Sequence, residues 1–335
     1  MSETLLEVQD LKVHFPIESG VFGRSKESVK AVDGISFNLE RGETFSLVGE
    51  SGCGKSTTAL AVLRMLNITS GRIQFAGQDI TTMSQSTLRP LRRRIQMVYQ
   101  DPFASLNPRM KIGDIIGEPL QVHGIHADQK QLRARIKELM DLVGLLPDMA
   151  DRYPHEFSGG QRQRVGIARA LALNPDLLIC DEAVSALDVS IQAQILNLLM
   201  DLQQELKLTY LFIAHDLSVV RHISDRVGVM YLGRLVEVAD AKSLFADPRH
   251  PYTQALLAAV PIADPALEAT RPQQLIVGEV PSVRRPPDGC RFHPRCSSIM
   301  DQCKTSVPQL QGNDRQVACH LETQASTTAA PHVQR

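Results

Sequence analysis

The chain has 335 residues, of which 43% are hydrophobic, and its formal net charge at pH 7 is −1. The hydrophobic fraction is ample for a buried core, and the length predicts about two domains of about 150 residues each. A charge so close to zero excludes a global basic field that would attract nucleic acid. The opening residues, MSETLLEVQD, show no basic segment followed by an apolar stretch, and nowhere do about eighteen apolar residues run together. We therefore expect neither a secretion signal nor a membrane-spanning helix.

The first predicted elements are strands on either side of a glycine-rich loop. Residue patterns predict strands at 5–15, 31–40 and 71–77, which we expect to form an antiparallel β-layer. Between them, residues 43–49 have the pattern of an apolar strand, and residues 55–66 have helical spacing of apolar side chains. This order of strand, loop and helix is typical of a phosphate-binding loop.

The loop itself has the sequence GESGCGKS, a match to the pattern G-x-x-x-x-G-K-[ST]. Its glycines let successive backbone N–H groups face a phosphate chain, while Lys55 supplies positive charge and Ser56 a hydroxyl for Mg²⁺. A chance glycine-rich turn explains this setting poorly, so we expect ATP or GTP here. The residues assigned to nucleotide binding are Gly49, Glu50, Ser51, Gly52, Cys53, Gly54, Lys55, Ser56 and Thr57.

A largely helical insertion is predicted next, over about residues 101–172. It follows an apolar strand at 95–100 and contains an amphipathic helix at 129–142. Near its end, the sequence Ser158-Gly159-Gly160-Gln161 precedes a helix, and such a helix start binds anions. Because the chain already has one phosphate-binding loop, we expect this second one to close over the nucleotide of another subunit. On its own, the same sequence is also compatible with a flexible turn.

Two acids follow a buried strand at residues 177–182, LLICDE. We expect Asp181 to hold Mg²⁺ and Glu182 to orient and polarise the attacking water. The alternative is that the pair only caps the next helix. Helices at 189–205 and 217–223 then alternate with a strand at 209–214, which predicts a parallel α/β topology.

The composition changes after about residue 252, where prolines become frequent. We expect a separate C-terminal module over residues 261–335 with a disordered tail. Four cysteines cluster in it, which in a chain without a signal peptide indicates metal more than disulfides. The spacing lacks a C-x2-C pair and so favours a [4Fe–4S] cluster, with Zn²⁺ and free thiols as alternatives. These residues are Cys290, Cys296, Cys303 and Cys319.

In their order and spacing, the segments GESGCGKST, FSGGQRQR, LLICDE and SALD, together with Gln100 and His215, resemble the ATP-binding subunits of ABC transporters over residues 5–260. The segments YQDPFASLNPRM, RYPHEFSGGQ, SALDVSIQAQILNLL and HPYTQALLAAVP are similar to those of bacterial oligopeptide and dipeptide importers, and most of all to their F-type ATPase subunits. The resemblance implies an α/β fold, a P-loop NTPase of ABC type. It would have a RecA-like core, an antiparallel β-subdomain and a helical subdomain within residues 1–260, followed by a small C-terminal extension.

The same resemblance implies roles for four further residues. Phe15 takes the place of the aromatic side chain that stacks on adenine, where Tyr is commoner. Gln100 would reach Mg²⁺ and the water, and would link the site to the membrane subunit. His215 would hydrogen-bond the γ-phosphate, and Asp188 lies in the segment that touches the partner ATPase. The implied catalytic residues are Glu182, Gln100 and His215.

Two positions depart from the family pattern. Ala183 stands where Pro is usual after the Asp-Glu pair, and Phe157 replaces the commoner Leu before Ser-Gly-Gly-Gln. Neither change removes a charged group. Ala183 restores an N–H and backbone freedom that Pro denies, so the geometry of Glu182 is expected to be slightly looser.

The implied function is ATP hydrolysis, with Mg²⁺, that energises uptake of short peptides. Expected partners are a second, paralogous ATPase, two membrane-spanning permeases and, indirectly, an extracytoplasmic peptide-binding protein, with no nucleic acid. The expected location is the cytoplasmic face of the bacterial inner membrane, as a peripheral protein. Importers of another small substrate, such as nickel or glutathione, remain an alternative.

Interpretations from other classes of protein fit less well. A soluble ABC ATPase of DNA repair would carry long heptad coiled coils between Lys55 and Asp181, and none appears. A translation ATPase would usually have two cassettes, and this chain has one. A metal-binding regulator with a vestigial ATPase would need damaged motifs, whereas Lys55, Gln161 and Glu182 are intact.

Overall fold

The computed structural model describes residues 3–17, 28–125, 128–260 and 278–322. The chain forms two compact units and passes between them several times. The first unit comprises Met1–Glu7, Asn38–Thr44 and Gln74–Ala214, and the second comprises Val8–Phe37, Phe45–Ile73 and His215–Arg335. Among the described residues, no helix is long and apolar enough to cross a membrane.

Three parallel strands form the base of the first unit: β6 (Ile95–Val98), β7 (Leu177–Asp181) and β8 (Thr209–Ile213). Strand β7 lies in the middle, and all five of its residues are buried. Strands covered on both faces have apolar runs instead of alternation, which explains why LLIC precedes the acids. Because the strands are parallel, their carboxyl ends meet at one edge, where Asp181 lies.

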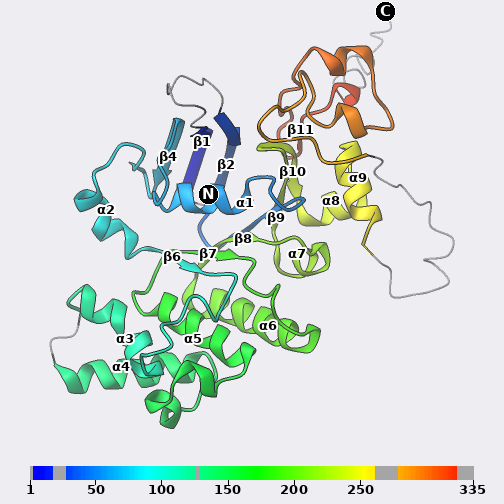
Figure 1. Ribbon diagram of the computed structural model, residues 1–335. Coiled ribbons are helices and arrows are strands. Elements are labelled where there is room, and N and C mark those ends of the chain that lie inside the picture. The colour runs from blue at the N-terminus through cyan, green and yellow to red at the C-terminus, as the bar shows by residue number, and fades with distance from the viewer. Residues whose placement is uncertain (1–2, 18–27, 126–127, 261–277, 323–335) are drawn as a thin grey trace, which may run out of the picture. The chain divides into compact units, whose positions relative to one another are not determined.

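Helices make up most of the rest of the first unit (Figure 1). Helix α3 contacts both α4 and α5, and apolar side chains such as Ile116, Leu139 and Ile167 are fully buried. This packing confirms helices within the predicted insertion, although its boundaries stay a prediction. The elements are α2 (Gln85–Arg92), α3 (Ile112–Val122), α4 (Gln129–Leu142), η1 (Pro147–Asp151), η2 (Pro154–Glu156), α5 (Gly159–Leu171) and α6 (Val189–Leu206).

The second unit is organised around strand β9 (Arg226–Tyr231), which pairs in parallel with β3 (Thr44–Val48) and antiparallel with β10 (Arg234–Asp240). A further sheet has the strand order β2–β1–β4–β5, with bounds β1 (Thr4–Pro16), β2 (Ser28–Glu40), β4 (Ser70–Phe75) and β5 (Gln78–Asp79). The helices are α1 (Lys55–Val62), α7 (Leu217–Ile223), α8 (Ala241–Ala246), α9 (Pro251–Ala258), η3 (His293–Arg295) and η4 (Asp301–Lys304).

Helix α1 is shorter than its apolar pattern predicts. The expected helix runs over residues 55–66, but the observed helix ends at Val62. Arg64 adopts a left-handed backbone with φ of +54°, which stops helical hydrogen bonding. Apolar residues beyond Val62 therefore continue the pattern without continuing the helix.

The prediction of a separate Cys/Pro-rich module is not supported. Its described residues, 278–322, group with the second unit, and their strand β11 (Gln316–Val317) extends the sheet by pairing with β10. Arg315 also donates to Glu237 of β10 at 2.7 Å, and Glu237 is fully buried. The expected disordered tail and the boundary at residue 261 lie outside the described residues.

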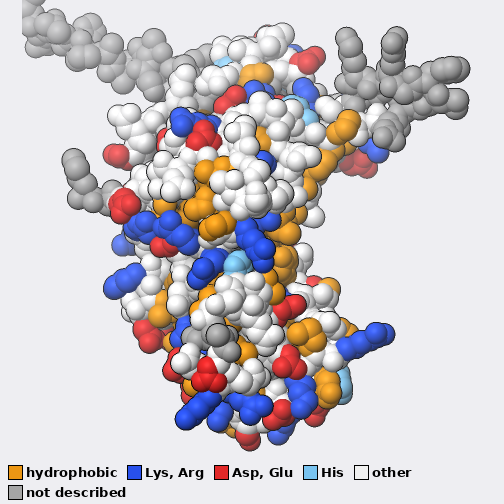
Figure 2. All heavy atoms as spheres, turned by 90° about the vertical axis from the view of Figure 1, so that its left-hand side faces the viewer, with side chains coloured by type: hydrophobic (Ala, Val, Ile, Leu, Met, Phe, Trp, Pro, Cys, Tyr) orange, Lys and Arg blue, Asp and Glu red, His pale blue; other side chains and the backbone are white. Residues whose placement is uncertain are grey.

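Acidic and basic side chains are interspersed over the face shown in Figure 2. Neither charge forms a continuous field on this face, in keeping with the formal net charge of −1.

Candidate functional site

The phosphate-binding loop connects β3 to α1 in the second unit, and its backbone requires glycine at two positions. Gly49 and Gly54 have φ of +149° and +111°. A Cβ at Gly49 would lie 2.1 Å from the Met230 carbonyl oxygen, and a Cβ at Gly54 would lie 2.2 Å from that of Ala31. The glycines of the motif therefore let the loop pack directly against neighbouring backbone, where any other residue would clash.

The side chain of Lys55 folds back onto the start of the phosphate-binding loop. This side chain is buried, and Nζ donates to the carbonyl oxygens of Gly49 at 2.8 Å and Glu50 at 3.2 Å. Hydrogen bonds from an ammonium to charged phosphate oxygens are stronger than those to neutral carbonyls, so a bound phosphate chain would compete for Lys55. Cys53 is buried beside it, and burial raises the pKa of its thiol, so Cys53 packs as a neutral side chain.

Phe15 lies near the end of strand β1 with 40% of its surface exposed, so its ring is accessible to a planar base. The preceding residue, His14, is fixed by Asp33: His14 Nε2 lies 2.9 Å from Asp33 Oδ1. His215, in the same unit, is exposed just after β8. Both implied contacts to the nucleotide are therefore accessible.

The two acids lie at the end of β7 in the first unit, as the sequence predicts, and their roles stay a prediction. Asp181 is buried, and Glu182 leaves the strand with a left-handed backbone, φ +48°. Gln100 Nε2 donates to Glu182 Oε2 at 2.7 Å, so the structure brings together the two groups predicted to handle the attacking water. A non-glycine residue with this φ is strained, and such strain is common where a side chain must be aimed. No residue pattern indicates this strain beforehand.

Ala183, directly after this strained residue, is buried with 1% of its surface exposed. Glu182 N donates to the Ile213 carbonyl oxygen at 2.9 Å, and the Glu182 carbonyl accepts from Ser185 Oγ at 2.9 Å. These hydrogen bonds hold the backbone of Glu182 from both sides. The looser geometry expected from Ala183 is therefore opposed by local bonds.

The Ser158-Gly159-Gly160-Gln161 segment begins helix α5 with a complete capping box. Ser158 Oγ accepts from Gln161 N at 3.3 Å, and Gln161 Oε1 accepts from Ser158 N at 2.9 Å. A Cβ on Gly160 would lie 2.5 Å from Ile191 Cγ2, so this glycine is needed for packing against α6. The segment therefore forms the capped start of a helix, held by the chain's own contacts.

The segment after Glu182 presents two exposed side chains. Asp188 is exposed as the N-cap residue of α6, and the next residue, Val189, has 81% of its surface exposed. This position is consistent with the partner contact that the family implies for Asp188.

The four C-terminal cysteines give no support to a metal centre. All are free thiols, and burial raises the pKa of Cys290 to about 11, with smaller upward shifts for Cys296 and Cys319. Within residues 278–322 and the other described ranges, no group of three or more His, Cys, Asp or Glu is placed to hold a metal ion. The expected [4Fe–4S] or Zn²⁺ site therefore has no structural support.

Sequence reasoning missed the side chains that hold the loop from outside. Arg295 and Tyr252 both bond Glu50, the second residue of the motif. They lie some two hundred residues or more further along the chain, and no local pattern links them to the loop. Only the fold brings them there.

Comparisons with known proteins agree with this arrangement. The ABC transporter family profile matches residues 32–185, and the profile of the oligopeptide/dipeptide transporter C-terminal region matches residues 236–303. The oligopeptide transport ATP-binding protein AppF of Bacillus subtilis is 54% identical over 95% of this chain and 98% of its own length. The oligopeptide transport ATP-binding protein OppF of Salmonella typhimurium is 52% identical over 95% of this chain and 96% of its own length. The di/tripeptide transport ATP-binding protein DppF of Pseudomonas aeruginosa is 50% identical over 95% of this chain and 98% of its own length.

Solved structures show the same fold. CbiO1 from Clostridium perfringens, part of the ABC transporter complex cbiONQ, has a TM-score of 0.64 at 29% identity, and the match covers 73% of this chain and 92% of that one. A dimeric bacterial ABC transporter cassette has a TM-score of 0.63 at 26% identity, covering 71% and 99%. The chain therefore belongs to the ATP-binding subunits of ABC transporters, in the group that carries the oligopeptide/dipeptide transporter C-terminal region.

Proposed function

We propose that this chain is the ATP-binding and hydrolysing subunit that energises uptake of short peptides by an ABC importer. The observation that carries the proposal is the hydrogen bond from Gln100 to Glu182, directly after Asp181. A vestigial ATPase would have no use for a carboxylate held in a strained backbone at the end of a buried strand. The choice of peptide follows the relatives, whose names specify oligopeptides and di- or tripeptides.

Nucleotide binding is assigned to the phosphate-binding loop and to Phe15. The glycine cradle, closed to any Cβ at Gly49 and Gly54, and the buried ammonium of Lys55 fit a phosphate chain. Residues Ser51, Gly52, Ser56 and Thr57 belong to the same cradle. Phe15 supplies the stacking face for adenine.

Mg²⁺ would be held by Ser56, Gln100 and Asp181, and would supply charge neutralisation on the phosphates. A hydroxyl, a carboxylate and an amide oxygen are hard oxygen donors, which suits this ion. Asp181 is positioned for such a role by its place at the carboxyl end of β7.

Hydrolysis is assigned to Glu182, Gln100 and His215. The Glu182 carboxylate would accept a hydrogen bond from water and draw off its proton as the water oxygen attacks the γ-phosphorus. Gln100, which now occupies one carboxylate oxygen, would yield that oxygen or share it with the water. His215 would donate to the γ-phosphate, and ADP would leave with the electrons of the broken P–O bond.

Coupling to transport requires a second ATPase. We assign Ser158, Gly159, Gly160 and Gln161 to the nucleotide of that partner, since α5 begins there with its N-terminus ordered. The partner would be a paralogous subunit, and two permeases would bind the pair at the cytoplasmic face of the inner membrane. A peptide-binding protein outside would deliver the cargo.

Affinity purification of the tagged chain from detergent-solubilised membranes tests this assembly. We expect two permeases and a second ATPase to co-purify, and we expect the complex to hydrolyse ATP. A chain that is recovered alone from membranes and hydrolyses no ATP would contradict the proposal. If the permeases that co-purify are specific for nickel or glutathione, that compound and not a peptide is the substrate of the transporter.

A further inference from the structure

Glu50, the second residue of the phosphate-binding loop, is held from several sides within the second unit. Its backbone N–H donates to Tyr252 Oη at 3.0 Å, and its carbonyl accepts from Lys55 Nζ at 3.2 Å and from Cys53 N at 3.3 Å. Its carboxylate accepts from Arg295 Nη1 at 2.9 Å and from Nη2 at 3.1 Å. Such a forked pair fixes orientation as well as charge.

Arg295 is built into its position. Its side chain is only 7% exposed, and Nη1 also donates to Tyr231 Oη at 3.3 Å. A buried guanidinium without an acid would be strongly destabilising, so the fold here is arranged around the pair with Glu50. Arg295 ends the short helix η3 (His293–Arg295), in the region that the nucleotide-binding motifs do not include.

An aromatic cluster packs the start of η3 against strand β9 and helix α9. The ring of Phe292 lies 5.3 Å from the rings of both Tyr231 and Tyr252, which are themselves 4.7 Å apart. All three side chains are buried. Each aromatic pair contributes beyond its buried area, so the position of Arg295 is rigidly supported.

A second arginine close by, Arg291, is also buried and bonds groups of the second unit. Arg291 donates to the Leu232 carbonyl oxygen and to Asp33. Asp33 also contacts His14, the neighbour of Phe15. Burial acts to raise the pKa of Asp33, but Arg291, His14 and Arg234 outweigh it and hold the pKa at about 2. Asp33 therefore remains a charged partner for Arg291 at physiological pH.

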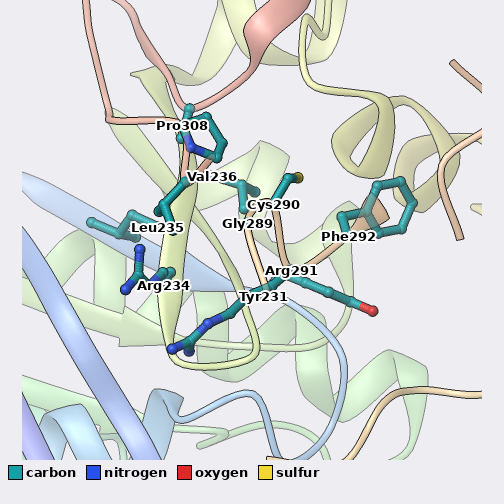
Figure 3. Close-up of a pocket in the computed structure, with 11 residues that line it drawn as sticks. Tyr231, Arg234, Leu235, Val236, Gly289, Cys290, Arg291, Phe292 and Pro308 are labelled. Carbon is teal, nitrogen blue, oxygen red and sulfur yellow. The ribbon is translucent and has the colours of Figure 1, made fainter. Parts of the chain in front are cut away.

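Figure 3 shows the seam between this segment and the turn of β9 and β10, with Gly289, Cys290 and Phe292 on one side and Leu235 and Val236 on the other. The cavity there is about 30 Å³. A volume of this size holds a water molecule or two at most and not a ligand. The seam is thus a close-packed joint.

We propose that the segment 290–295 positions the phosphate-binding loop, and that Arg295 is a positioning residue for ATP binding. The inference rests on the proposed nucleotide site. Arg295 acts in two ways: it neutralises a carboxylate carried on a loop that must receive phosphates, and it fixes Glu50 so that the loop is ordered before the nucleotide arrives. Both effects lower the cost of binding.

The first test is the variant Arg295→Gln in the full-length protein, with Mg·ATP binding measured by titration calorimetry. We expect Kd to rise by about tenfold, a typical coupling between a supporting contact and a binding site. The control is Arg249→Gln, which removes an arginine that pairs with Glu322 at 3.0 Å on an exposed part of the same region. We expect this control to leave Kd unchanged.

Charge and kinetics distinguish positioning from a general loss of folding. The double variant Glu50→Gln with Arg295→Gln removes the unpaired carboxylate and should recover part of the lost affinity. In the assembled transporter, Arg295→Gln should raise KM for ATP and leave kcat close to wild type, whereas unfolding would lower kcat. Arg295→Lys keeps the charge but not the fork, and should have an intermediate Kd.

The outcomes separate the two proposals. If the wild-type protein binds no ATP, the proposed function fails. If the wild type binds ATP and Arg295→Gln binds it equally well with an unchanged KM, the positioning role of Arg295 is wrong. An equal loss of affinity in Arg249→Gln, or a double variant no better than Arg295→Gln, would assign the effect to stability and overturn the proposal as well.

Discussion

At the scale of single residues, the hydrolytic assignment depends on Glu182. Its strained backbone and its hydrogen bond from Gln100 fix a carboxylate directly after Asp181. The side chain has to carry negative charge in order to accept a proton from water. Size and hydrogen bonding alone do not suffice for this role.

The variant Glu182→Gln keeps the shape and loses the charge. We expect ATP hydrolysis by the assembled transporter to fall by a factor of about 10² or more, because base catalysis is typically worth that much, while ATP still binds. Release of inorganic phosphate measures the hydrolysis, and a nucleotide-binding assay measures the retained binding. Glu205→Gln, on an exposed part of α6, is the control and should hydrolyse normally. Near-normal turnover in Glu182→Gln would remove Glu182 from the mechanism.

A second prediction at this scale concerns the buried pair of Asp33 and Arg291. Asp33→Asn leaves the guanidinium of Arg291 buried without its partner, so we expect a loss of about 3 kcal/mol in the free energy of unfolding. Urea unfolding followed by circular dichroism measures it. Asp301→Asn, at a fully exposed pair with Lys304, should change little.

The pH dependence of this contribution follows from the lowered pKa. Asp33 titrates at about 2 in the folded protein and at 3.8 in the unfolded chain, so its contribution is present above about pH 4 and is lost as the pH falls towards 2. The difference between wild type and Asp33→Asn should therefore be as large at pH 5 as at pH 7. Between pH 4 and pH 2 the difference should shrink, and a difference that stays constant down to pH 2 would show that the pKa is not lowered.

At the scale of elements, the N-terminus of α5 serves two purposes. Its capping box orders Ser158 and Gln161, and Gly160 packs against Ile191 of α6. A substitution at Gly160 would therefore disturb the chain's own packing and would not isolate a contact with a partner. Ser158 is exposed, so it is the better position for a test.

Ser158→Asp keeps the helix cap, since Asp and Ser cap equally well, and places a negative charge where the partner's phosphates are proposed to bind. We expect hydrolysis by the assembled transporter to fall by about a hundredfold or more, because juxtaposed like charges cost several kcal/mol. ATP binding by the isolated chain should not change. Ser158→Asn is the neutral control. Loss of ATP binding by the isolated Ser158→Asp chain would contradict the arrangement between subunits.

Elements whose signals are local could be predicted from the sequence. The phosphate-binding loop, the acids after β7 and the start of α5 each depend on a few adjacent residues, and each is found where expected. The end of α1 could not be predicted, because the left-handed backbone at Arg64 leaves no mark in an apolar pattern. The need for glycine at position 160 could not be predicted either, because it comes from a contact with Ile191, thirty-one residues further along the chain.

At the scale of the whole molecule, the largest gap between sequence and structure is the C-terminal region. Its cysteines favoured a metal-stapled module, but residues 278–322 are held by strand pairing and by arginines that pair with buried or half-buried acids. Arg295 and Glu50 are 245 positions apart in the chain, so no spacing rule relates them. Long-range ion pairs of this kind are fixed by topology and become visible only in the fold.

The central claim is that ATP hydrolysis by this chain powers the uptake of short peptides. The direct measurement uses proteoliposomes that contain the permeases and both ATPases, with the nucleotide sites facing outward and the peptide-binding protein enclosed with a radiolabelled short peptide. We predict that the peptide moves from the enclosed side to the outside only when Mg·ATP is added outside, and that Glu182→Gln abolishes this movement. Peptide movement that is independent of ATP, or unchanged in Glu182→Gln, would contradict the account.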